Sequence, residues 1–245
     1  DLHSFPTRRS SDLVGGVPPE TCSVVRKKTD VPLVFIDCYF DDDGLVYHNI
    51  GLDDWQGTYQ MTWYLREMGH SAIAFLADRK DPVGGDRDRL EGFMQALTNS
   101  GIKNPENHFV PLSKDCAERT DVYNFLCADK RPFTALFFSA DYYAAEALAY
   151  FQKQGLRIPE DLSIAGFDDN IYAKVVNPSL TTVYQDVFQR GCAAVDMLVK
   201  LIKKQPVEEP NVHFPVRLIL RDSVARLAPT RSEERRVGKE CKSRW

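Results

Sequence analysis

Short apolar runs alternate with amphipathic segments through the middle of this sequence. Residues 31–37 (VPLVFID), 71–77 (SAIAFLA), 134–140 (TALFFSA) and 162–169 (LSIAGFDD) are such runs, and their length and apolar character predict strands buried on both faces. The segment HFVPL at 108–112 is a further strand candidate. Because strands that alternate with helices form βα units around a parallel sheet, the sequence predicts an α/β fold.

The segments between these runs are predicted helices. They cover residues 54–68, 87–100, 118–128, 141–154 and 187–204. Gly69 and Gly155 stand where left-handed C-terminal caps would fall. Asp53 or Asp54 can cap the first of these helices. Residues 212–223 are expected to form an extended segment near the end of the chain.

Composition excludes several classes of protein. The chain of 245 residues is 43% hydrophobic, but no stretch approaches the roughly 18–20 consecutive apolar residues that a membrane span needs. The 14 glycines and 14 prolines exclude collagen-like and low-complexity chains. The six cysteines form neither a CxxC pair nor a cluster with zinc spacing, so we expect free thiols in a reducing compartment, the cytoplasm.

The two ends of the chain differ in character from its middle. Residues 1–13 (DLHSFPTRRSSDL) are rich in Arg and Ser, and residues 231–245 (RSEERRVGKECKSRW) form a charge run that ends in Trp. Codons can be chosen for residues 3–12 whose reverse complement encodes RSEERRVGKE, the sequence of residues 231–240. Two unrelated tails almost never have this relation, so both ends resemble a translated sequencing adapter, and we leave them out of functional reasoning. The alternative is an ordinary disordered charge run.

Without these ends the chain is more acidic. They contain eight Lys or Arg and five Asp or Glu, so the formal net charge changes from −4 for the whole chain to −7 for residues 14–230. Binding to phosphates depends on clustered Lys and Arg side chains. This segment is therefore expected to be a poor surface for nucleic acid.

Charged side chains stand at the ends of several predicted strands, the edge at which open parallel sheets bind ligands. Asp37 ends the first strand, Arg89 comes after the second, Asp141 follows the fourth, and Asp168 lies at the end of the fifth. Carboxylates accept hydrogen bonds and Arg donates two parallel ones, a combination that binds the vicinal hydroxyls of sugars. Each residue has a structural alternative, because Asp also forms helix caps and turns and Arg89 can form a surface ion pair.

Motifs of common enzyme families are missing. The sequence has no GxSxG, HExxH, GxxxxGK[ST] or GxGxxG motif, so we expect no catalytic residue, no metal site and no cofactor. His70 directly follows Gly69, and an interaction with the helix dipole explains its place. Cys38 is expected to be a buried structural thiol. Trp55 and Trp63, on one predicted helix, are expected to serve packing.

Several segments, in order along the chain, carry a family resemblance. The runs at 49–76 (NIGLDDWQGTYQMTWYLREMGHSAIAFL) and 87–102 (RDRLEGFMQALTNSGI) precede the more specific runs GLRIPEDLSIAGFDD at 155–169 and PSLTTVYQD at 178–186. In this order they resemble the effector-binding region of the LacI/GalR family of bacterial transcription regulators, over residues 31–224. The resemblance implies a periplasmic-binding-protein-like fold of two Rossmann-like parallel-sheet subdomains with crossover connections.

The resemblance also implies a division of the chain. Residues 52–183 and 213–224 are expected to form the C-terminal subdomain, and residues 14–51 and 184–212 part of an N-terminal subdomain that is incomplete. The helix-turn-helix headpiece with which this family binds DNA is expected to be absent from this fragment.

The resemblance assigns roles to four residues of an effector site. Arg89, before LEGF, matches the arginine that clamps the effector, and Asp168 in GFDD matches the acid that accepts from its hydroxyls. Asp37 matches a polar group on the opposite wall, and Gln185 lies in a crossing segment near the site. The chain departs from the family at Ala140, where many members have Asn, so a hydrogen-bond donor and an acceptor are missing there.

An aromatic residue that stacks on the effector is also expected. Tyr39 and Tyr142 are the candidates, and packing is the alternative for both.

The function implied is that of the effector-sensing part of a DNA-binding regulator. A sugar or sugar derivative would shift the equilibrium between two subdomain arrangements, and a homodimer would change its affinity for operator DNA through the headpiece. The alternatives are a sugar-binding protein of a transport system, which would need a signal peptide upstream of Val14, and an enzyme, which would need a nucleophile or metal constellation.

Overall fold

The computed structural model describes residues 11–14, 19–38, 47–78, 83–128 and 131–227, in which strands and helices alternate. The strands are β1 (Ser11–Val14), β2 (Leu33–Ile36), β3 (Asn49–Leu52), β4 (Ile73–Ala77), β5 (Phe109–Pro111), β6 (Ala135–Phe138), β7 (Ser163–Asp168), β8 (Thr181–Tyr184), β9 (Asn211–Phe214) and β10 (Arg217–Ile219). The helices are α1 (Pro19–Lys28), α2 (Asp54–Glu67), α3 (Gly85–Asn99), α4 (Cys116–Leu126), α5 (Asp141–Lys153), α6 (Ile171–Val175), α7 (Val187–Ile202) and the 3-10 helix η1 (Pro105–His108).

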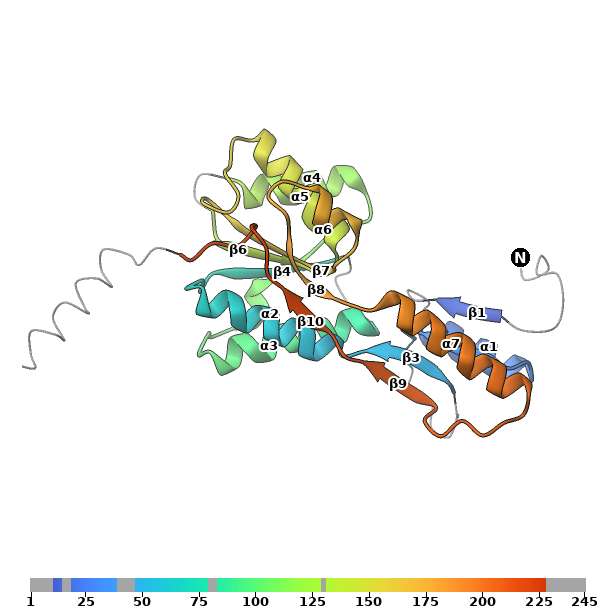
Figure 1. The fold of residues 1–245 in the computed structure, drawn as a ribbon. Helices are drawn as coiled ribbons and strands as arrows, with labels where there is room; N and C mark the ends of the chain where they lie inside the picture. The colour runs from blue at the N-terminus through green and yellow to red at the C-terminus, as the bar shows by residue number, and fades with distance from the viewer. Residues whose placement is uncertain (1–10, 15–18, 39–46, 79–82, 129–130, 228–245) are drawn as a thin grey trace, which may run out of the picture.

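Two separate sheets give the molecule two lobes (Figure 1). The first lobe contains a four-stranded sheet in the order β1-β2-β3-β9, and the second a six-stranded sheet in the order β10-β8-β7-β6-β4-β5. Neighbouring strands are parallel in both sheets, apart from the antiparallel pair of β10 and β8 at one edge. The α/β fold with two mainly parallel sheets is confirmed.

The chain passes from one sheet to the other at three places: after β3, between β8 and α7, and between β9 and β10. After the second passage Asp186 caps α7, because its side chain accepts a hydrogen bond from the Gln189 amide at 2.9 Å. The third passage follows Phe214, so the division expected between residues 212 and 213 falls inside β9. β1 is an edge strand beside β2, and it includes residues 11–13 of the adapter-like N-terminal end.

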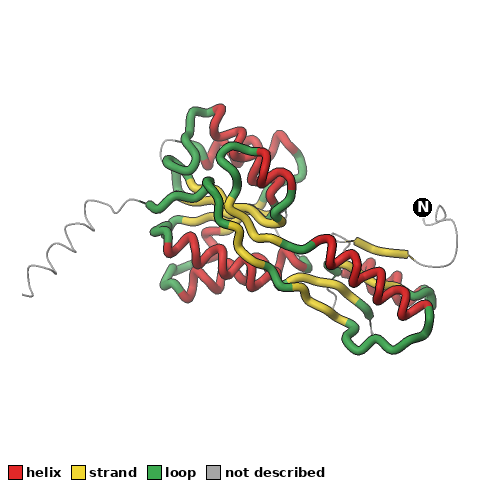
Figure 2. Tube along the Cα trace, in the orientation of Figure 1, coloured by secondary structure: helices red, strands yellow, loops and turns green. Residues whose placement is uncertain are grey.

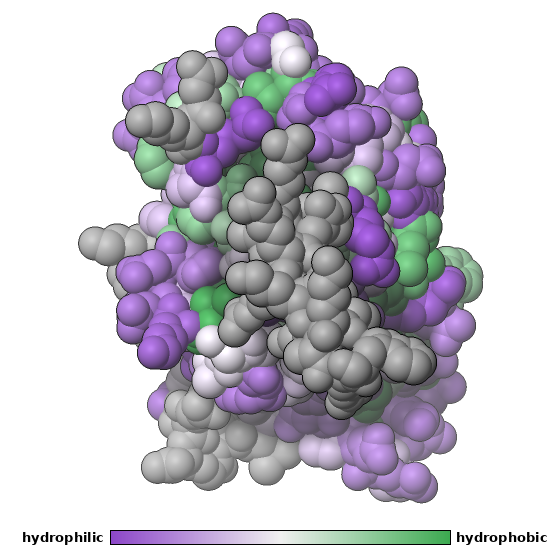
Figure 3. All heavy atoms as spheres, turned by 90° about the vertical axis from the view of Figure 1, so that its left-hand side faces the viewer, coloured by the Kyte–Doolittle hydropathy of each residue, from purple (hydrophilic) through white to green (hydrophobic). Residues whose placement is uncertain are grey.

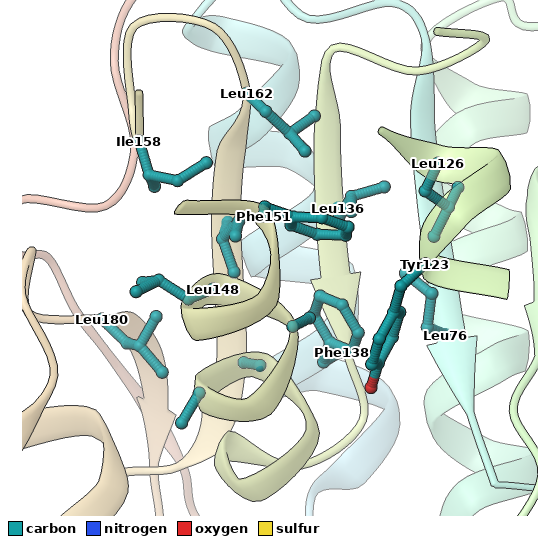
Figure 4. Close-up of a cluster of buried hydrophobic side chains, with 14 of the residues drawn as sticks. Leu76, Tyr123, Leu126, Leu136, Phe138, Leu148, Phe151, Ile158, Leu162 and Leu180 are labelled. Atoms are coloured by element: carbon teal, nitrogen blue, oxygen red, sulfur yellow. The ribbon is translucent and has the colours of Figure 1, made fainter. Parts of the chain in front are cut away.

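Helices cover both faces of the larger sheet, as Figure 2 shows. On one side α4 and α5 enclose an apolar cluster that includes Leu136, Phe138 and Phe151, which are at most 1% exposed (Figure 4). On the other side α2 and α3 bury Phe75 and Phe93 completely. Removing this apolar area from water is the main force that holds the second lobe together.

α7 covers one face of the smaller sheet. Ala194, Met197 and Leu198 point inward from α7 onto Val34 and Ile50. Within the part of the chain that the structure describes, no helix is both long and apolar enough to cross a membrane. On the face shown in Figure 3, hydrophilic side chains predominate and apolar ones gather in separate patches.

The structure can be compared with several predictions made for single residues. Gly69 and Gly155 have φ values of +94° and +88°, as expected for left-handed helix ends. Cys38 is buried, with 2% of its surface exposed, as expected. The ring of His70 is buried, its two nitrogens form hydrogen bonds with Thr134 and Ala225, and burial lowers its pKa. Its interaction with the helix dipole stays a prediction.

Candidate functional site

Arg89 lies on α3, and neighbours on three sides fix its guanidinium. Nε donates to Asp54 Oδ1 at 2.7 Å and Nη1 donates to the backbone carbonyl of Ser139 at 2.6 Å. The central carbon lies 3.8 Å from the centroid of the Phe167 ring. Burial by itself lowers the pKa of Arg89, but the carboxylates of Asp54 and Asp168 outweigh burial and raise the pKa above its usual value. Arg89 is therefore a charged donor held in one orientation.

Asp54 orients Arg89 from the first position of α2. The residue is 1% exposed; its Oδ1 accepts from Arg89, whereas its buried Oδ2 has no hydrogen-bond partner. Burial raises the pKa of Asp54, and Arg89 acts in the opposite direction. Asp53 occupies the N-cap position without a side-chain hydrogen bond. Asp53 is therefore the N-cap residue, as one of the two alternatives expected, but it caps the helix without a side-chain hydrogen bond.

Asp168 stands at the end of β7 beside Gln185. Its Oδ1 accepts from Gln185 Nε2 at 2.6 Å. Burial raises the pKa of Asp168 to about 6, against the lowering effects of Arg89 and Gln185, so the carboxyl is a hydrogen-bond acceptor at neutral pH. Its φ of +115° lies in a region that costs a non-glycine residue about 1–3 kcal/mol. The surrounding structure holds the Asp168 carboxylate in place against this strain.

Arg190 connects this acid to the first lobe. The residue lies on α7, is 5% exposed, and donates from Nη1 to Gln185 Oε1 at 2.5 Å and from Nη2 to Asp37 Oδ1. Asp37 follows β2 in the first lobe, whereas Asp168 ends β7 in the second. We name the series Asp37–Arg190–Gln185–Asp168 the inter-lobe network, because its hydrogen bonds run without a break from one lobe to the other.

Asp141 differs from the other predicted site residues in its surroundings. It is fully buried, its Oδ1 accepts from Thr182 Oγ1 at 2.6 Å, and its Oδ2 accepts from the amide of Asn170 at 3.0 Å. Burial raises the pKa of Asp141 to about 7. Since the protein itself engages both oxygens, this geometry favours a structural role for Asp141, and its contact with an effector stays a prediction.

The aromatic candidates are less well defined. Tyr39 lies outside the described residues. Tyr142 is 44% exposed at the start of α5 and meets the rings of Tyr143 and Tyr172 edge to face, at centroid distances of 5.3 and 5.6 Å. Its stacking on an effector stays a prediction. Ala140 is the N-cap of α5 and supplies no side-chain hydrogen bond there.

Sequence reasoning missed Arg190, although a signal was present. Arg190 shares the inward face of α7 with Ala194 and Met197, both of which are buried. A charge on an otherwise apolar helix face indicates a buried group that must find a partner. The partner, Asp37, is 153 residues away in the sequence and could not be identified from spacing.

The structure brings four of the predicted residues into one place: Arg89, Asp168, Gln185 and Asp37. The site offers a fixed guanidinium on one side and carboxylate and amide groups from both lobes on the other. Such a set of donors and acceptors can bind vicinal hydroxyls of a polyol. A ligand that bound there would contact both lobes at once.

Comparisons with known proteins agree with this geometry. The family described as the periplasmic binding protein-like domain matches residues 62–224. The transcriptional regulator RegA of Clostridium saccharobutylicum is 32% identical over 184 residues, which are 75% of this chain and 55% of RegA. The chain spans only part of such curated relatives, between 55% and 63% of their length.

Solved structures resemble the chain over most of its length. A transcription regulator from Lactobacillus plantarum is 26% identical, with a TM-score of 0.78, over 91% of this chain and 83% of that protein. The transcriptional regulator CelR, whose structure is a complex with cellobiose, is 25% identical to this chain, with a TM-score of 0.76, over 86% of this chain and 64% of CelR.

Proposed function

The chain belongs to the periplasmic binding protein-like domain family, and on this premise we propose that it is the effector-binding part of a LacI/GalR-type transcriptional regulator. The observation that carries the proposal is the inter-lobe network. Arg89 and Asp168 face one region of the second lobe, and Gln185 and Arg190 join that region to Asp37 of the first. A ligand bound among these groups acts on both lobes.

The effector we propose is a sugar or sugar derivative. Its hydroxyls would accept from Arg89 and donate to the ionised Asp168. CelR, which shares this fold at 25% identity, is in complex with cellobiose, and this supports a carbohydrate. The protein would act by binding alone, without chemistry of its own.

The mechanism is a shift between two lobe arrangements. In the structure, Gln185 donates to the Asp168 oxygen that an effector hydroxyl would use. An effector that occupies Asp168 would replace this bond and favour the arrangement it binds more tightly. In the intact regulator, operator DNA would be held by a helix-turn-helix headpiece N-terminal to residue 14, in the cytoplasm. The net charge of −7 for residues 14–230 fits a DNA contact made elsewhere.

We also propose that the regulator is a homodimer. Ile171, Tyr172 and Val175 of α6 are 63%, 43% and 66% exposed, and Tyr142 of α5 contacts Tyr172. An apolar patch of this kind on the surface is typical of an interface between subunits. The alternative of a transport-system sugar-binding protein has less support, because RegA and CelR are both named transcriptional regulators.

Calorimetry with cellobiose and a panel of mono- and disaccharides tests the proposal. We expect one sugar to bind the unaltered chain, and Arg89→Lys to weaken its binding by about 1.5–3 kcal/mol, because Lys cannot reproduce the fixed fork of donors. Arg89→Ala should abolish binding, but it also leaves Asp54 buried without a partner. The lysine variant therefore separates binding from folding.

Arg87→Ala is the matched control, since Arg87 is on the same helix but its side chain is 51% exposed and pairs with Asp88 and Glu91. Its affinity should equal that of the unaltered chain. Binding that is unaffected by both Arg89 variants would remove Arg89 from the site. A chain that binds no sugar in the panel would contradict the proposed effector class.

A further inference from the structure

The outer face of α2 carries three aromatic rings, one helical turn apart. The rings of Trp55 and Tyr59 are stacked at a centroid distance of 4.9 Å and an angle of 12°, and those of Tyr59 and Trp63 at 6.2 Å and 11°. Trp55 and Trp63 are 37% and 39% exposed. We call these three residues the aromatic ladder. The two tryptophans were expected to serve packing. They pack against Tyr59 at the surface, and part of each ring is exposed to solvent.

Two features of α3 hold the ladder in place. Gly92 lies directly under Trp55, and a Cβ atom there would be 2.3 Å from the Trp55 carbonyl oxygen, so the two helices approach closely. Asn99 Nδ2 donates to Tyr59 Oη at 3.2 Å, and Gln95 Nε2 donates to Asn99 Oδ1 at 2.8 Å. The middle ring is thus oriented by a relay of two amides, and the ladder is ordered before any ligand arrives.

A hollow of about 370 Å³ runs beside the ladder, between α2 and Leu218 of β10. Tyr59, Trp63 and Tyr64 form part of its wall, and its polar groups include the amides of Gln56 and Gln60 and the carboxylate of Glu67. This volume lies within the range of about 300–1,000 Å³ that is typical of small-molecule sites.

The chemistry of the hollow selects a class of ligand. Aromatic faces carry negative charge density and attract the C–H faces of sugar rings, while amides both donate to and accept from hydroxyls. No Lys or Arg is among the described residues that line the hollow, so nothing there would balance a phosphate or sulfate group. Eight residues of helix separate the two tryptophans, a distance of about 12 Å, which is longer than a single sugar ring.

We propose that the aromatic ladder and this hollow form a second binding site, for a neutral oligosaccharide. Trp63, which lines the hollow and is 39% exposed, supplies the stacking surface, and the Tyr59 ring supports it from behind. Gln56, Gln60 and Glu67 hold the hydroxyls. The site shares no residue with the inter-lobe network. It is thus additional to the proposed effector site and does not depend on it.

Tryptophan fluorescence gives a direct test, because the only tryptophans in the sequence are Trp55, Trp63 and Trp245. In a Trp245→Phe background, all tryptophan emission comes from the ladder. We expect titration with cellotetraose or maltotetraose to change this emission in a saturable manner. Gln60→Ala should weaken binding several-fold, and Trp63→Ala, followed by calorimetry, about tenfold or more. Circular dichroism should show both variants folded, since both side chains are at the surface.

Two further variants separate this site from other sources of binding. Phe125 is 59% exposed on α4, across the sheet from α2, so Phe125→Ala is a matched loss of a surface aromatic ring and should leave the titration unchanged. Arg89→Lys should also leave it unchanged, because Arg89 belongs to the other site. Sensitivity to Arg89→Lys, or the absence of a saturable change with both oligosaccharides at millimolar concentration, would overturn the proposal. Quenching of the tryptophan emission by an arginine-rich peptide, but not by the oligosaccharides, would also overturn the proposal, because it would identify the ladder as a surface for a cationic protein.

Discussion

Asp168 ends one strand of the larger sheet and Asp141 follows the neighbouring strand, yet their carboxyls have different partners. Asp168 is joined to Gln185 and faces Arg89, whereas Asp141 is enclosed by Thr182 and the Asn170 amide. Burial is the main cause of the raised pKa in both. Position at a strand end is therefore compatible with two functions, and only the surroundings of the carboxyl distinguish a binding group from a structural one.

Asp141→Asn should separate these functions. The amide can donate to Thr182 Oγ1 and accept from the Asn170 amide, so it can replace both hydrogen bonds. The folded-state pKa of Asp141, about 7, lies above the usual value of an aspartate, so the stability that the protonated group contributes is lost as the pH rises toward 7. Relative to the unaltered chain, the variant should gain free energy of unfolding between pH 5 and 7, and the difference should be constant above pH 7.5.

Urea unfolding at several pH values measures this difference, and calorimetry with the effector measures the affinity. An Asp141→Asn variant with unchanged stability at every pH, but with much weaker effector binding, would restore Asp141 to the binding site. Asp168→Asn is the matched variant, which we expect to lose affinity for the effector.

α2 and α3 pack so closely that a glycine decides their contact. A Cβ atom at Gly92 would lie 2.3 Å from the Trp55 carbonyl oxygen and 3.1 Å from its carbon, both backbone atoms that cannot turn away. α2 positions Asp54, which orients Arg89, and α3 carries Arg89 itself. The spacing of these two helices therefore sets the geometry of the site.

Gly92→Ala should destabilise the protein by about 1–3 kcal/mol, because the overpacking outweighs the helix propensity that alanine adds. Gly191→Ala on α7 is the control, since beyond its chain neighbours and the backbone of its own helix no atom lies within 4 Å of the Cβ it would add. That variant should be more stable by about 0.5–1 kcal/mol. Urea unfolding measures the free energy of unfolding of both variants. Equal changes in the two would contradict the close contact of α2 and α3.

Across the whole molecule, the lobes are linked by three passages of the chain and by the inter-lobe network. Arg190→Met removes the centre of this network. We expect a larger radius of gyration in X-ray scattering and a loss of stability toward the low end of about 3–5 kcal/mol, since the Asp37 side chain is 31% exposed and keeps some contact with water. Arg157→Met, at a residue whose side chain is 71% exposed, is the control. Scattering curves that do not differ between the two variants would show that the network does not hold the lobes together.

The proposed dimer makes a separate prediction at this scale. If the α6 patch is the interface, the unaltered chain should sediment as a dimer at micromolar concentration. Ile171→Asp places a charge in this patch, so the variant should sediment as a monomer. Val195→Asp, at a residue 58% exposed on α7, should leave the dimer intact. A monomeric unaltered chain would contradict the dimer, and a dimeric Ile171→Asp variant would move the interface to another surface.

The sequence determined the elements whose character is local. The apolar runs that became β4, β6 and β7 could be recognised because burial on both faces demands apolar side chains at every position. Gly69 and Gly155 marked helix ends because a left-handed backbone favours glycine. β3 and β8 were not predicted: Asn49 and Gly51 make β3 look like a loop, and Thr181 and Thr182 of β8 are polar although both are fully buried.

The pairing of the charges depends on how the two lobes pack. Asp37 and Arg190 are 153 residues apart, and Arg89 and Asp54 are 35 apart, so no helical or strand period connects them. The strand order brings the ends of separate strands together, and burial then removes water as a competing partner, which makes each charge depend on the one opposite it. The residue types were therefore legible from the sequence, whereas their pairing, and with it the function of each carboxylate, was fixed by the packing of the two lobes.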